Sequence, residues 1–448
     1  MAGELRESIY GEIAADFAEE PLRSLCDPEV GIQTGPFGSQ LHQEDYVALG
    51  TPIITVEHLG ENRILHDGVP RVSDIDRDRL SRYFLRKGDI VFSRVGSVDR
   101  RALVRSAEDG WMFSGRCLRV RPNPKKIDPG YLSYFFGLPT FREHIRAIAV
   151  GATMPSLNTT LLSNVLVPHP QDIAEQRTIS HILGTLDDKI ELNRRMNETL
   201  EAMARALFQS WFVDFDPVRA KAESRDPDLP EPLADLFPDS FENSELGEIP
   251  RGWDEGSFGE VISQRTERVG TRNVIVLSAV ASGKLVRSDD HFTKRVYSKK
   301  TDKYLVVEQW DFAYNPSRIN IGSIGMLEEA TLGGVSPVYV VARPKPAYRW
   351  FLEFSIRRAW TKTWINTLAS GSVRQSLSYA DFASIPCVVP PEVVAQEFNR
   401  RWSALRKGIR AHEAESRTLA ALRDALLPKL IAGELRLGDP AHFAVRGD

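Results

Sequence analysis

Cysteine is scarce in this sequence of 448 residues, and the few cysteines present form no pattern. Cys26, Cys117 and Cys387 are odd in number and far apart, so they predict neither a disulfide framework nor a cysteine metal site. Such sparse, unpatterned cysteine is typical of a protein from a reducing compartment, and we expect this one in the cytoplasm.

The sequence also lacks signals for export or for membrane insertion. Residues 1–8 contain no apolar run, so no secretory signal is predicted. No later stretch approaches the ~20 apolar residues that span a bilayer, so we expect no membrane partner. With 42% hydrophobic and 26% charged residues, the chain has the composition of a globular protein. Its length predicts about two to four domains.

Motifs for catalysis and cofactor binding are missing as well. Gly283-Lys284 lies in a run without the earlier glycine and the Ser/Thr of a phosphate loop, so it predicts a turn. Residues 315–318, Asn-Pro-Ser-Arg, are similar to an amino-methyltransferase motif, but the second proline and the aromatic residue are absent. No His-Glu-x-x-His pattern occurs. We therefore expect this chain to contribute no catalytic residue, no metal site and no cofactor site.

What the sequence does contain is a long-range repeat. Residues 151–170 are echoed by residues 371–390, with matching residues at an offset of 220 positions. Upstream, Gly-Asp-Ile-Val-Phe-Ser at Gly88 is echoed by Trp-Asp-Phe-Ala-Tyr-Asn at Trp310. Self-similarity on this scale predicts two related modules. Two related modules in one chain suit a ligand that has two sites.

Charge is spread unevenly along the chain. The net charge of −4 by itself does not favour a protein that binds nucleic acid. However, residues 214–248 contain 11 acidic and 3 basic residues, whereas residues 249–391 contain 19 basic and 13 acidic residues. A basic surplus in the second module suits contact with a phosphate backbone, although it is a weak indication by itself.

Each copy of the repeat is followed by a segment with the 4-3 spacing of a coiled coil. The first seam consists of Ile179, Leu183, Leu186, Ile190, Asn193, Asn197, Leu200, Ala204, Leu207 and Trp211. The second consists of Phe398, Trp402, Leu405, Ile409, His412, Ser416, Leu419, Arg423 and Leu426. Asp172 and Glu175 predict a capping box at the start of the first helix. About 40 residues at ~1.5 Å each predict a helix of roughly 60 Å.

Both seams become polar at their centres, with Asn193 and Asn197 in the first and His412 and Ser416 in the second. If the helices pair, these four residues form one polar layer, which disfavours slipped registers. The alternative is that they are solvated where the seam opens. The segment after the first helix favours an antiparallel pair, because a parallel pair would send it back along ~60 Å.

We therefore predict an α+β fold in which two related α+β modules are joined by two long antiparallel coiled-coil helices and related by a pseudo-twofold axis. The predicted boundaries are residues 1–169 for the first module, 170–217 for the central helix, 218–247 for an acidic, proline-rich linker, 248–391 for the second module, 392–437 for the C-terminal helix and 438–448 for a tail. Strands are expected near Pro52, Asp89, Leu103 and Leu118 and over 273–279 and 335–342, and helices over 131–147 and 350–363.

Side chains suited to binding DNA gather where each module has turns. Arginine suits guanine edges, asparagine and glutamine suit adenine edges, and backbone amides in glycine-rich turns suit phosphates. The candidate DNA-contacting residues are Gln33, Thr34, Ser39, Gln40, Arg94, Arg100 and Arg101 in the first module, and Arg265, Arg268, Arg272, Lys284, Arg318, Asn320, Arg374 and Gln375 in the second. For each residue taken alone, a solvated surface position is the alternative.

Two helix-end motifs make the chain resemble a known family. They are Leu-Glu-Ala-Met-Ala-Arg-Ala-Leu-Phe-Gln-Ser-Trp-Phe-Val-Asp-Phe-Asp-Pro at residues 200–217 and Leu-Arg-Asp-Ala-Leu-Leu-Pro-Lys-Leu-Ile-Ala-Gly-Glu-Leu at residues 422–435. Leu-Gly-Glu-Ile-Pro-Arg-Gly-Trp at residues 246–253 and the run at residues 33–40 fit the same family. Over nearly its whole length the chain resembles the specificity (S) subunit of Type I restriction-modification enzymes.

The resemblance implies two target-recognition domains, each reading one half of a split double-stranded DNA target, with the helices setting the gap between the halves. It implies two methyltransferase (M) subunits that dock on the helices and modify adenine N6. Nuclease/translocase (R) subunits would join through M. S-adenosylmethionine, ATP and magnesium would then be bound by those partners, and this chain would be a non-catalytic targeting subunit.

Two other classes of function are alternatives. A stand-alone DNA methyltransferase would need the cofactor loop and the Asn/Asp-Pro-Pro-aromatic motif that the sequence lacks. A coiled-coil protein scaffold would use its two modules to bind proteins rather than DNA.

Overall fold

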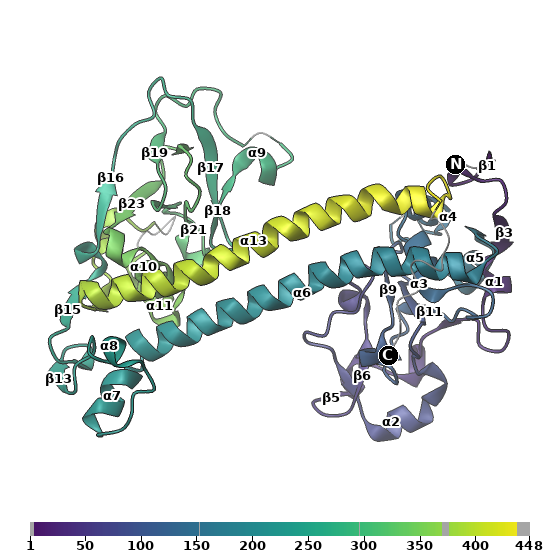
Figure 1. Ribbon diagram of the computed structural model, residues 1–448, viewed down its shortest axis with the longest axis horizontal. Coiled ribbons are helices and arrows are strands. Elements are labelled where there is room, and N and C mark those ends of the chain that lie inside the picture. Colours follow the sequence, from purple (N-terminus) through teal and green to yellow (C-terminus); the bar gives the residue numbers. More distant parts are fainter. Residues whose placement is uncertain (1–3, 152, 295, 370–375, 437–448) are drawn as a thin grey trace. The chain divides into compact units, whose positions relative to one another are not determined.

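The computed structural model describes residues 4–151, 153–294, 296–369 and 376–436. The chain forms two compact units (Figure 1). Unit 1 comprises residues 1–194 and 413–448, and unit 2 comprises residues 195–412. The chain passes from one unit to the other within two long helices, α6 (Ile173–Phe212) and α13 (Glu392–Ile431).

Unit 1 contains two four-stranded sheets, with the strand orders β4–β11–β8–β9 and β10–β6–β7–β5. Their strands are β4 (Ile32–Thr34), β11 (Cys117–Val120), β8 (Ile90–Ser93), β9 (Arg101–Leu103), β10 (Met112–Phe113), β6 (Thr51–Ile54), β7 (Arg71–Val72) and β5 (Tyr46–Val47). Two smaller pairs are β1 (Leu5–Ser8) with β2 (Gly11–Ala14) and β3 (Ala18–Pro21) with β12 (Leu166–His169). The short helices are α1 (Leu22–Leu25), α2 (Asp74–Arg79), α3 (Pro129–Phe135), α4 (Pro139–Ile148) and α5 (Thr159–Ser163).

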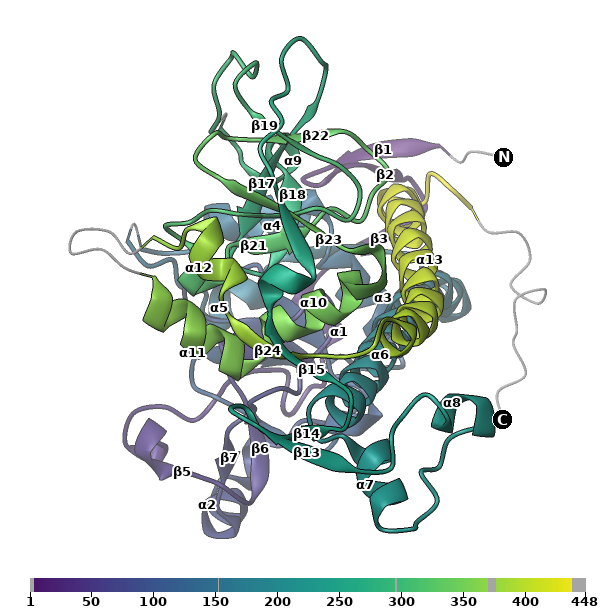
Figure 2. The ribbon, with the colours of Figure 1, turned by 90° about the vertical axis from the view of Figure 1, so that its left-hand side faces the viewer.

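Unit 2 also contains two four-stranded sheets, with the orders β16–β23–β20–β21 and β18–β17–β22–β19. Their strands are β16 (Ile262–Arg265), β23 (Val340–Pro344), β20 (Phe312–Tyr314), β21 (Ile324–Met326), β18 (Lys284–Arg287), β17 (Ile275–Val280), β22 (Gly333–Val335) and β19 (Leu305–Val307). The smaller pairs are β13 (Phe241–Ser244) with β14 (Gly247–Pro250) and β15 (Asp254–Ser257) with β24 (Pro386–Val389). The short helices are α7 (Asp216–Ala222), α8 (Glu231–Ala234), α9 (Ser288–His291), α10 (Arg349–Arg357), α11 (Ala359–Leu368) and α12 (Tyr379–Ala383), of which α10 to α12 face the viewer in Figure 2.

The two units are built on one plan. In each, the first-named sheet is antiparallel and its four strands follow in corresponding sequence order. In each, the second sheet contains one parallel pairing, β10 with β6 in unit 1 and β22 with β17 in unit 2. The predicted fold class, two related α+β modules with long paired helices, is therefore confirmed.

Within each unit, α6 and α13 lie against each other in antiparallel fashion. In unit 1, Asp187 near the start of α6 accepts a hydrogen bond from Arg423 near the end of α13, at 2.7 Å. In unit 2, Phe208 near the end of α6 packs on Phe398 near the start of α13, with ring centroids 5.7 Å apart. Every predicted seam position is buried or half-buried. Among the described residues, no helix combines the length and apolar character needed to cross a bilayer.

Several elements differ from the sequence-based predictions for local reasons. The helix predicted over 131–147 is divided, because Pro139 starts a second helix, α4, after α3 has ended. The helix predicted over 350–363 is divided at Arg358, which is extended between α10 and α11. The strand predicted over 335–342 is two strands, β22 and β23, separated by a turn in which the Tyr339 amide donates to the Ser336 carbonyl.

The predicted acidic linker, residues 218–247, is not a plain linker. Helix α6 ends at Phe212, and Phe215 adopts a left-handed conformation with φ 54° before α7 begins. Val218, Leu233 and Phe237 are then buried in the core of unit 2. The segment therefore folds onto unit 2, because these apolar side chains pack against the end of α6.

Candidate nucleic-acid interface

The first group of predicted DNA contacts lies at one end of the β4–β11–β8–β9 sheet of unit 1. Strands β4 and β8 both run antiparallel to β11, so they are parallel to each other and end at the same side of the sheet. The loops that follow these strands, residues 35–40 and 94–100, therefore adjoin each other. The Arg94 guanidinium lies over the Phe37 ring, 5.7 Å from its centroid, which ties the two loops together.

Unit 2 has the same arrangement. Strands β16 and β20 both run antiparallel to β23, so the loops 266–272 and 315–323 lie at one end of the sheet. The hairpin of β17 and β18, in which Lys284 is the first residue of β18, approaches this end closely. The Ser323 hydroxyl donates to the Ala279 carbonyl at 2.6 Å, and a Cβ added at Gly325 would lie 2.4 Å from the Leu285 nitrogen.

The loops after β4 and β16 correspond in detail. Each follows a strand that pairs in the same way with the next strand of its sheet, Gln33 opposite Arg119 and Arg265 opposite Val341. Each contains a glycine with positive φ, 62° at Gly38 and 60° at Gly270. The two sets of predicted contacts are therefore two copies of one structural feature.

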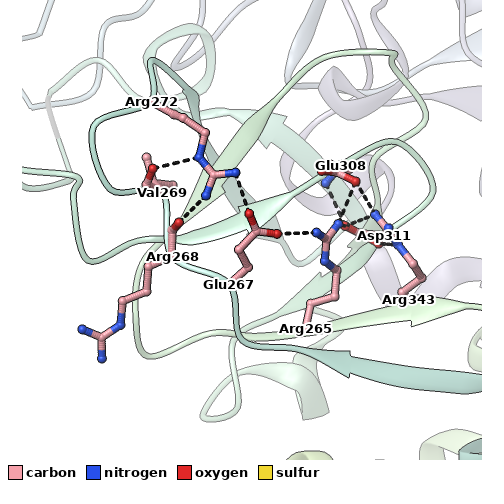
Figure 3. Close-up of polar contacts among 8 residues, drawn as sticks. All are labelled: Arg265, Glu267, Arg268, Val269, Arg272, Glu308, Asp311 and Arg343. Atoms are coloured by element: carbon pink, nitrogen blue, oxygen red, sulfur yellow. Dashed lines mark hydrogen bonds and ion pairs between the residues drawn. The ribbon is translucent and has the colours of Figure 1, made fainter.

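An ion pair built on a buried aspartate lies at the opposite end of each of these two sheets, before β8 in unit 1 and before β20 in unit 2. In unit 1, Asp89 accepts two hydrogen bonds from Arg121, at 2.8 and 2.7 Å, and one from the Arg86 amide at 2.8 Å. In unit 2, Asp311 accepts two from Arg343, at 2.7 and 3.0 Å, and one from the Glu308 amide at 2.8 Å (Figure 3). The three residues of each set recur at a constant offset along the chain. The bidentate pair therefore belongs to the common frame of both units.

Similarity to known proteins agrees with this duplicated frame. Residues 37–202 match the model of the family described as "Type I restriction modification DNA specificity domain". The chain is 24% identical over 431 residues to the Type I restriction enzyme HindI specificity subunit of Haemophilus influenzae, covering 84% of this chain and 92% of that protein. It is 25% identical over 323 residues to the Type I restriction enzyme MjaIX specificity subunit of Methanocaldococcus jannaschii, covering 68% and 69%.

The chain is therefore similar, over most of its length, to Type I restriction enzyme specificity subunits. Its fold is also that of the Type I restriction-modification S subunit from M. genitalium, whose crystal structure matches with a TM-score of 0.60 at 16% identity. That match covers 92% of this chain and 96% of the other.

Two arginines at the candidate interface of unit 2 are engaged in ion pairs within the protein. Arg265 is ion-paired with Glu267, Glu308 and Asp311, at 2.7, 2.8 and 3.2 Å (Figure 3). Arg272 is paired with Glu267 at 2.6 Å and also donates to the Val269 carbonyl. Both guanidinium groups are engaged within the protein, so a contact with DNA by either one would compete with these ion pairs.

This ion network also changes the acidity of one of its members. Hydrogen bonds from Arg265 and Arg343 hold the pKa of Glu308 at about 2, well below the ordinary value for a glutamate. The carboxylate is therefore charged throughout the physiological range, and it keeps both arginines in place.

In unit 1 the prediction of a DNA contact is wrong for Arg101. Its side chain is only 2% exposed, pairs with Glu61 at 2.9 Å and donates to the Ser133 carbonyl at 3.0 Å. Arg100 is half-buried and donates to the Leu59 carbonyl. Arg101 is therefore turned into the protein, whereas Arg100 is held by one internal hydrogen bond and stays partly exposed.

The two predicted glutamines are also partly engaged. The Gln33 side-chain oxygen accepts from Arg119 at 2.6 Å, and the Gln40 side-chain oxygen accepts from the Tyr83 hydroxyl at 2.9 Å. A two-point contact with adenine needs both the amide oxygen and the amide nitrogen. Each glutamine oxygen therefore has one acceptor site already occupied, which fixes the orientation of the side chain.

The remaining predicted contacts that the structure describes are at least half-exposed. Arg268, Lys284, Arg318 and Asn320 are exposed on the unit 2 edge, and Thr34 and Arg94 are half-exposed on the unit 1 edge. Arg374, Gln375 and the side chain of Ser39 lie outside the described residues. Within the described ranges, no group of three or more His, Cys, Asp or Glu side chains gathers as metal ligands would.

The predicted polar layer is observed separately within each unit. In unit 1, the Asn193 amide donates to Glu415 at 2.8 Å and to the Ser416 hydroxyl at 3.3 Å. In unit 2, a ring nitrogen of His412 lies 2.8 Å from the Asn197 side-chain oxygen. Asn193 is 0% exposed, so it is not a solvated residue at an open seam.

Sequence reasoning missed Phe37, although it lies inside the run at residues 33–40. Its side chain is 60% exposed, yet its loop is tightly held. A Cβ added at Gly115 would lie 2.4 Å from the Pro36 carbonyl oxygen and 2.7 Å from the Phe37 Cβ. A large apolar residue between two glycines at Gly35 and Gly38 was the available signal.

Proposed function

We propose that this chain is the DNA sequence-specificity subunit of a Type I restriction-modification complex and that it reads a two-part double-stranded DNA target without catalysing a reaction. One observation carries the proposal: the same pair of loops, on the same strand order and in a sheet with the same aspartate–arginine pair, occurs twice in one chain. Two related edges suit a target with two separate halves.

The exposed side chains on the unit 2 edge have the chemistry for this task. Arg268 and Arg318 suit guanine edges, Asn320 suits an adenine edge, and Lys284 suits a phosphate. On the unit 1 edge, Arg94 and Phe37 offer a cationic and aromatic surface. Such a surface supports stacking against bases.

The partners in this proposal are two methyltransferase subunits that modify adenine N6, with nuclease/translocase subunits joined through them in the cytoplasm. S-adenosylmethionine, ATP and magnesium belong to these partners. Met196 and Met203 support docking on α6, because they are exposed and seven residues apart, and therefore lie on one helix face. Exposed methionines adapt well to a partner surface.

Replacement of one module tests the proposal directly. Residues 1–169 are exchanged for the corresponding module of a related subunit, and methylation of host DNA is mapped by methylation-sensitive sequencing. One half of the target is expected to change while the other half and the spacer stay the same. A change in both halves, or methyl transfer by the purified chain alone, would contradict the proposal.

A second variant separates reading from spacing. One heptad is inserted at matching positions of α6 and α13, which preserves the seam on both helices. The spacer between the half-sites is expected to lengthen, with both half-sites unchanged. An altered half-site in this variant would show that the helices do more than set a distance.

A further inference from the structure

A lysine-rich segment in unit 2 contains none of the predicted DNA contacts. Residues 292–304, here called the basic segment, connect α9 to β19. They contain Lys294, Arg295, Lys299, Lys300 and Lys303 against one acidic residue, Asp302. The four lysines are all exposed.

The end of the basic segment is bonded to the loop after β16. The Val269 amide donates to the Tyr304 carbonyl at 2.8 Å, and the Gly270 amide donates to the Asp302 carbonyl at 2.9 Å. These bonds place the backbone around Lys303 directly beside the 266–272 loop of the candidate interface. The basic segment therefore extends that edge of unit 2.

Two tyrosines anchor the segment on either side of Lys299 and Lys300. Tyr304 is buried against Val269, and its hydroxyl accepts from the Ser298 amide at 3.2 Å. The Tyr297 hydroxyl donates to Asp289 at 2.7 Å. Because the backbone is already held, less conformational entropy is lost when the lysines bind a ligand.

The lysines of the basic segment differ from Arg265 and Arg272, on the adjoining loop, in whether a carboxylate pairs with them. In the described part of the chain, no carboxylate lies within ion-pair distance of Lys294, Lys299, Lys300 or Lys303. Arg265 and Arg272 on the adjoining loop are paired with carboxylates. Figure 3 shows the Arg268 side chain directed away from that ion network. The basic segment therefore adds positive charge beside Arg268 that no described carboxylate neutralises.

We propose that the basic segment is a binding site for the phosphates of the DNA backbone, beside the loop that reads bases in unit 2. The inference rests on the proposed function and adds a contact that carries no sequence information. Lysine ammonium groups are flexible point charges that suit phosphates, and neutralised phosphates release counterions. The corresponding stretch of unit 1, residues 70–82 at the 222-residue offset, contains four arginines and three aspartates. Arg77 and Arg79 there are ion-paired with Asp74, Asp78 and Asp76, so this stretch does not repeat the lysine-rich pattern of unit 2.

The salt dependence of DNA binding tests the proposal. Binding of the assembled complex is measured over a range of salt concentrations, on duplexes with and without the target, for wild type and for Lys294→Gln/Lys299→Gln/Lys300→Gln/Lys303→Gln. The slope of log K against log salt is expected to become shallower by roughly 0.9 for each phosphate that the variant no longer neutralises. Affinity should fall by a similar factor on both duplexes, and the methylated sequence should not change.

A matched pair of double variants controls for charge alone. Lys299→Gln/Lys300→Gln removes two charges from the basic segment. Lys345→Gln/Lys362→Gln removes two exposed charges from elsewhere in unit 2, and Lys345 directly follows β23 at the opposite end of the sheet. Only the first pair is expected to change the slope.

Two outcomes would contradict the inference, and a third would contradict the proposed function on which it rests. An unchanged slope in the quadruple variant would overturn it. Weaker assembly of the complex with an unchanged slope would overturn it in favour of an acidic protein surface as the ligand. If the wild-type complex bound both duplexes equally, the proposed function would fail, and the slope on non-specific DNA would still decide the role of the lysines.

Discussion

The two units share the same strand order and the same aspartate–arginine pair, but the loops at the candidate interface expose different side chains. In unit 1, Phe37 is exposed and stacked with Arg94. The corresponding residue in unit 2, Val269, is only 1% exposed and packs on Tyr304. Unit 2 instead exposes the lysines of the basic segment. Strand order and the aspartate–arginine pair are therefore common to both units, whereas the side chains exposed at the candidate interface differ.

The largest expected effect concerns the aspartate–arginine pairs, Asp89–Arg121 in unit 1 and Asp311–Arg343 in unit 2. In unit 1, Asp89→Ala would leave Arg121 buried, with only 10% of its side chain exposed. No other described carboxylate lies within ion-pair distance of it, so we expect a loss of about 3–5 kcal/mol in stability. In unit 2, Asp311→Ala leaves Arg343 39% exposed and still paired with Glu308, so we expect a loss of about 1–3 kcal/mol.

Hydrogen exchange of the β8 and β20 amides in the full chain measures the two effects separately, since the units need not unfold together. Asp74→Ala is the matched control, because its ion pair with Arg77 is exposed and contributes less than about 1 kcal/mol. Equal losses from Asp89→Ala and Asp311→Ala would show that the two pairs contribute equally to stability, contrary to their burial.

The edges themselves can be compared through Phe37. Stacking of a base on an aromatic side chain contributes about 1–3 kcal/mol. Phe37→Ala is therefore expected to weaken target binding by roughly 10- to 100-fold and to leave the salt slope unchanged. Leu49→Ala is the control, because Leu49 is 86% exposed and lies outside the paired loops of the sheet end. Equilibrium binding by the assembled complex measures both variants, and equal effects would exclude a base contact by Phe37.

The two related units and the two long helices were largely predictable from the sequence, because the residue patterns that indicate them are periodic or repeated. The heptad spacing indicated both long helices, and the echo of Gly88 by Trp310 marked equivalent positions, which have φ of 93° and 74°. The sequence did not reveal that the β1–β2 and β13–β14 hairpins correspond, because their glycines, Gly11 and Gly247, do not share the 220-residue offset.

The state of individual arginines could not be predicted, because their partners are distant in sequence. Arg101 pairs with Glu61, 40 residues away, and Arg265 pairs with Asp311, 46 residues away. Nothing local distinguishes these residues from the exposed Arg318. The folding of residues 218–247 onto unit 2 was missed for a similar reason. Its buried residues, such as Val218 and Phe237, are too widely spaced to form a pattern.

The smallest expected difference between the units is in how their stability depends on pH. Glu308 has a folded pKa of about 2, compared with ~4.3 for an unfolded glutamate, so its ion pairs stabilise unit 2 above about pH 4–5. That stabilisation is lost as the pH falls towards 2. Because the Glu308 side chain is 43% exposed, solvent screening reduces the effect to less than about 1 kcal/mol.

Unit 1 lacks this acid-sensitive contribution because Arg86 occupies the position of Glu308, and only its backbone amide serves Asp89. We therefore expect Glu308→Gln to lower the protection of β20 amides from hydrogen exchange at pH 6 and to have progressively less effect at lower pH. Protection of β8 amides should be the same in both proteins at each pH. If the difference in β20 persisted unchanged at pH 3, the carboxylate would not be held by Arg265 and Arg343. The ion network would then not explain why Arg265 is engaged within the protein at the candidate interface.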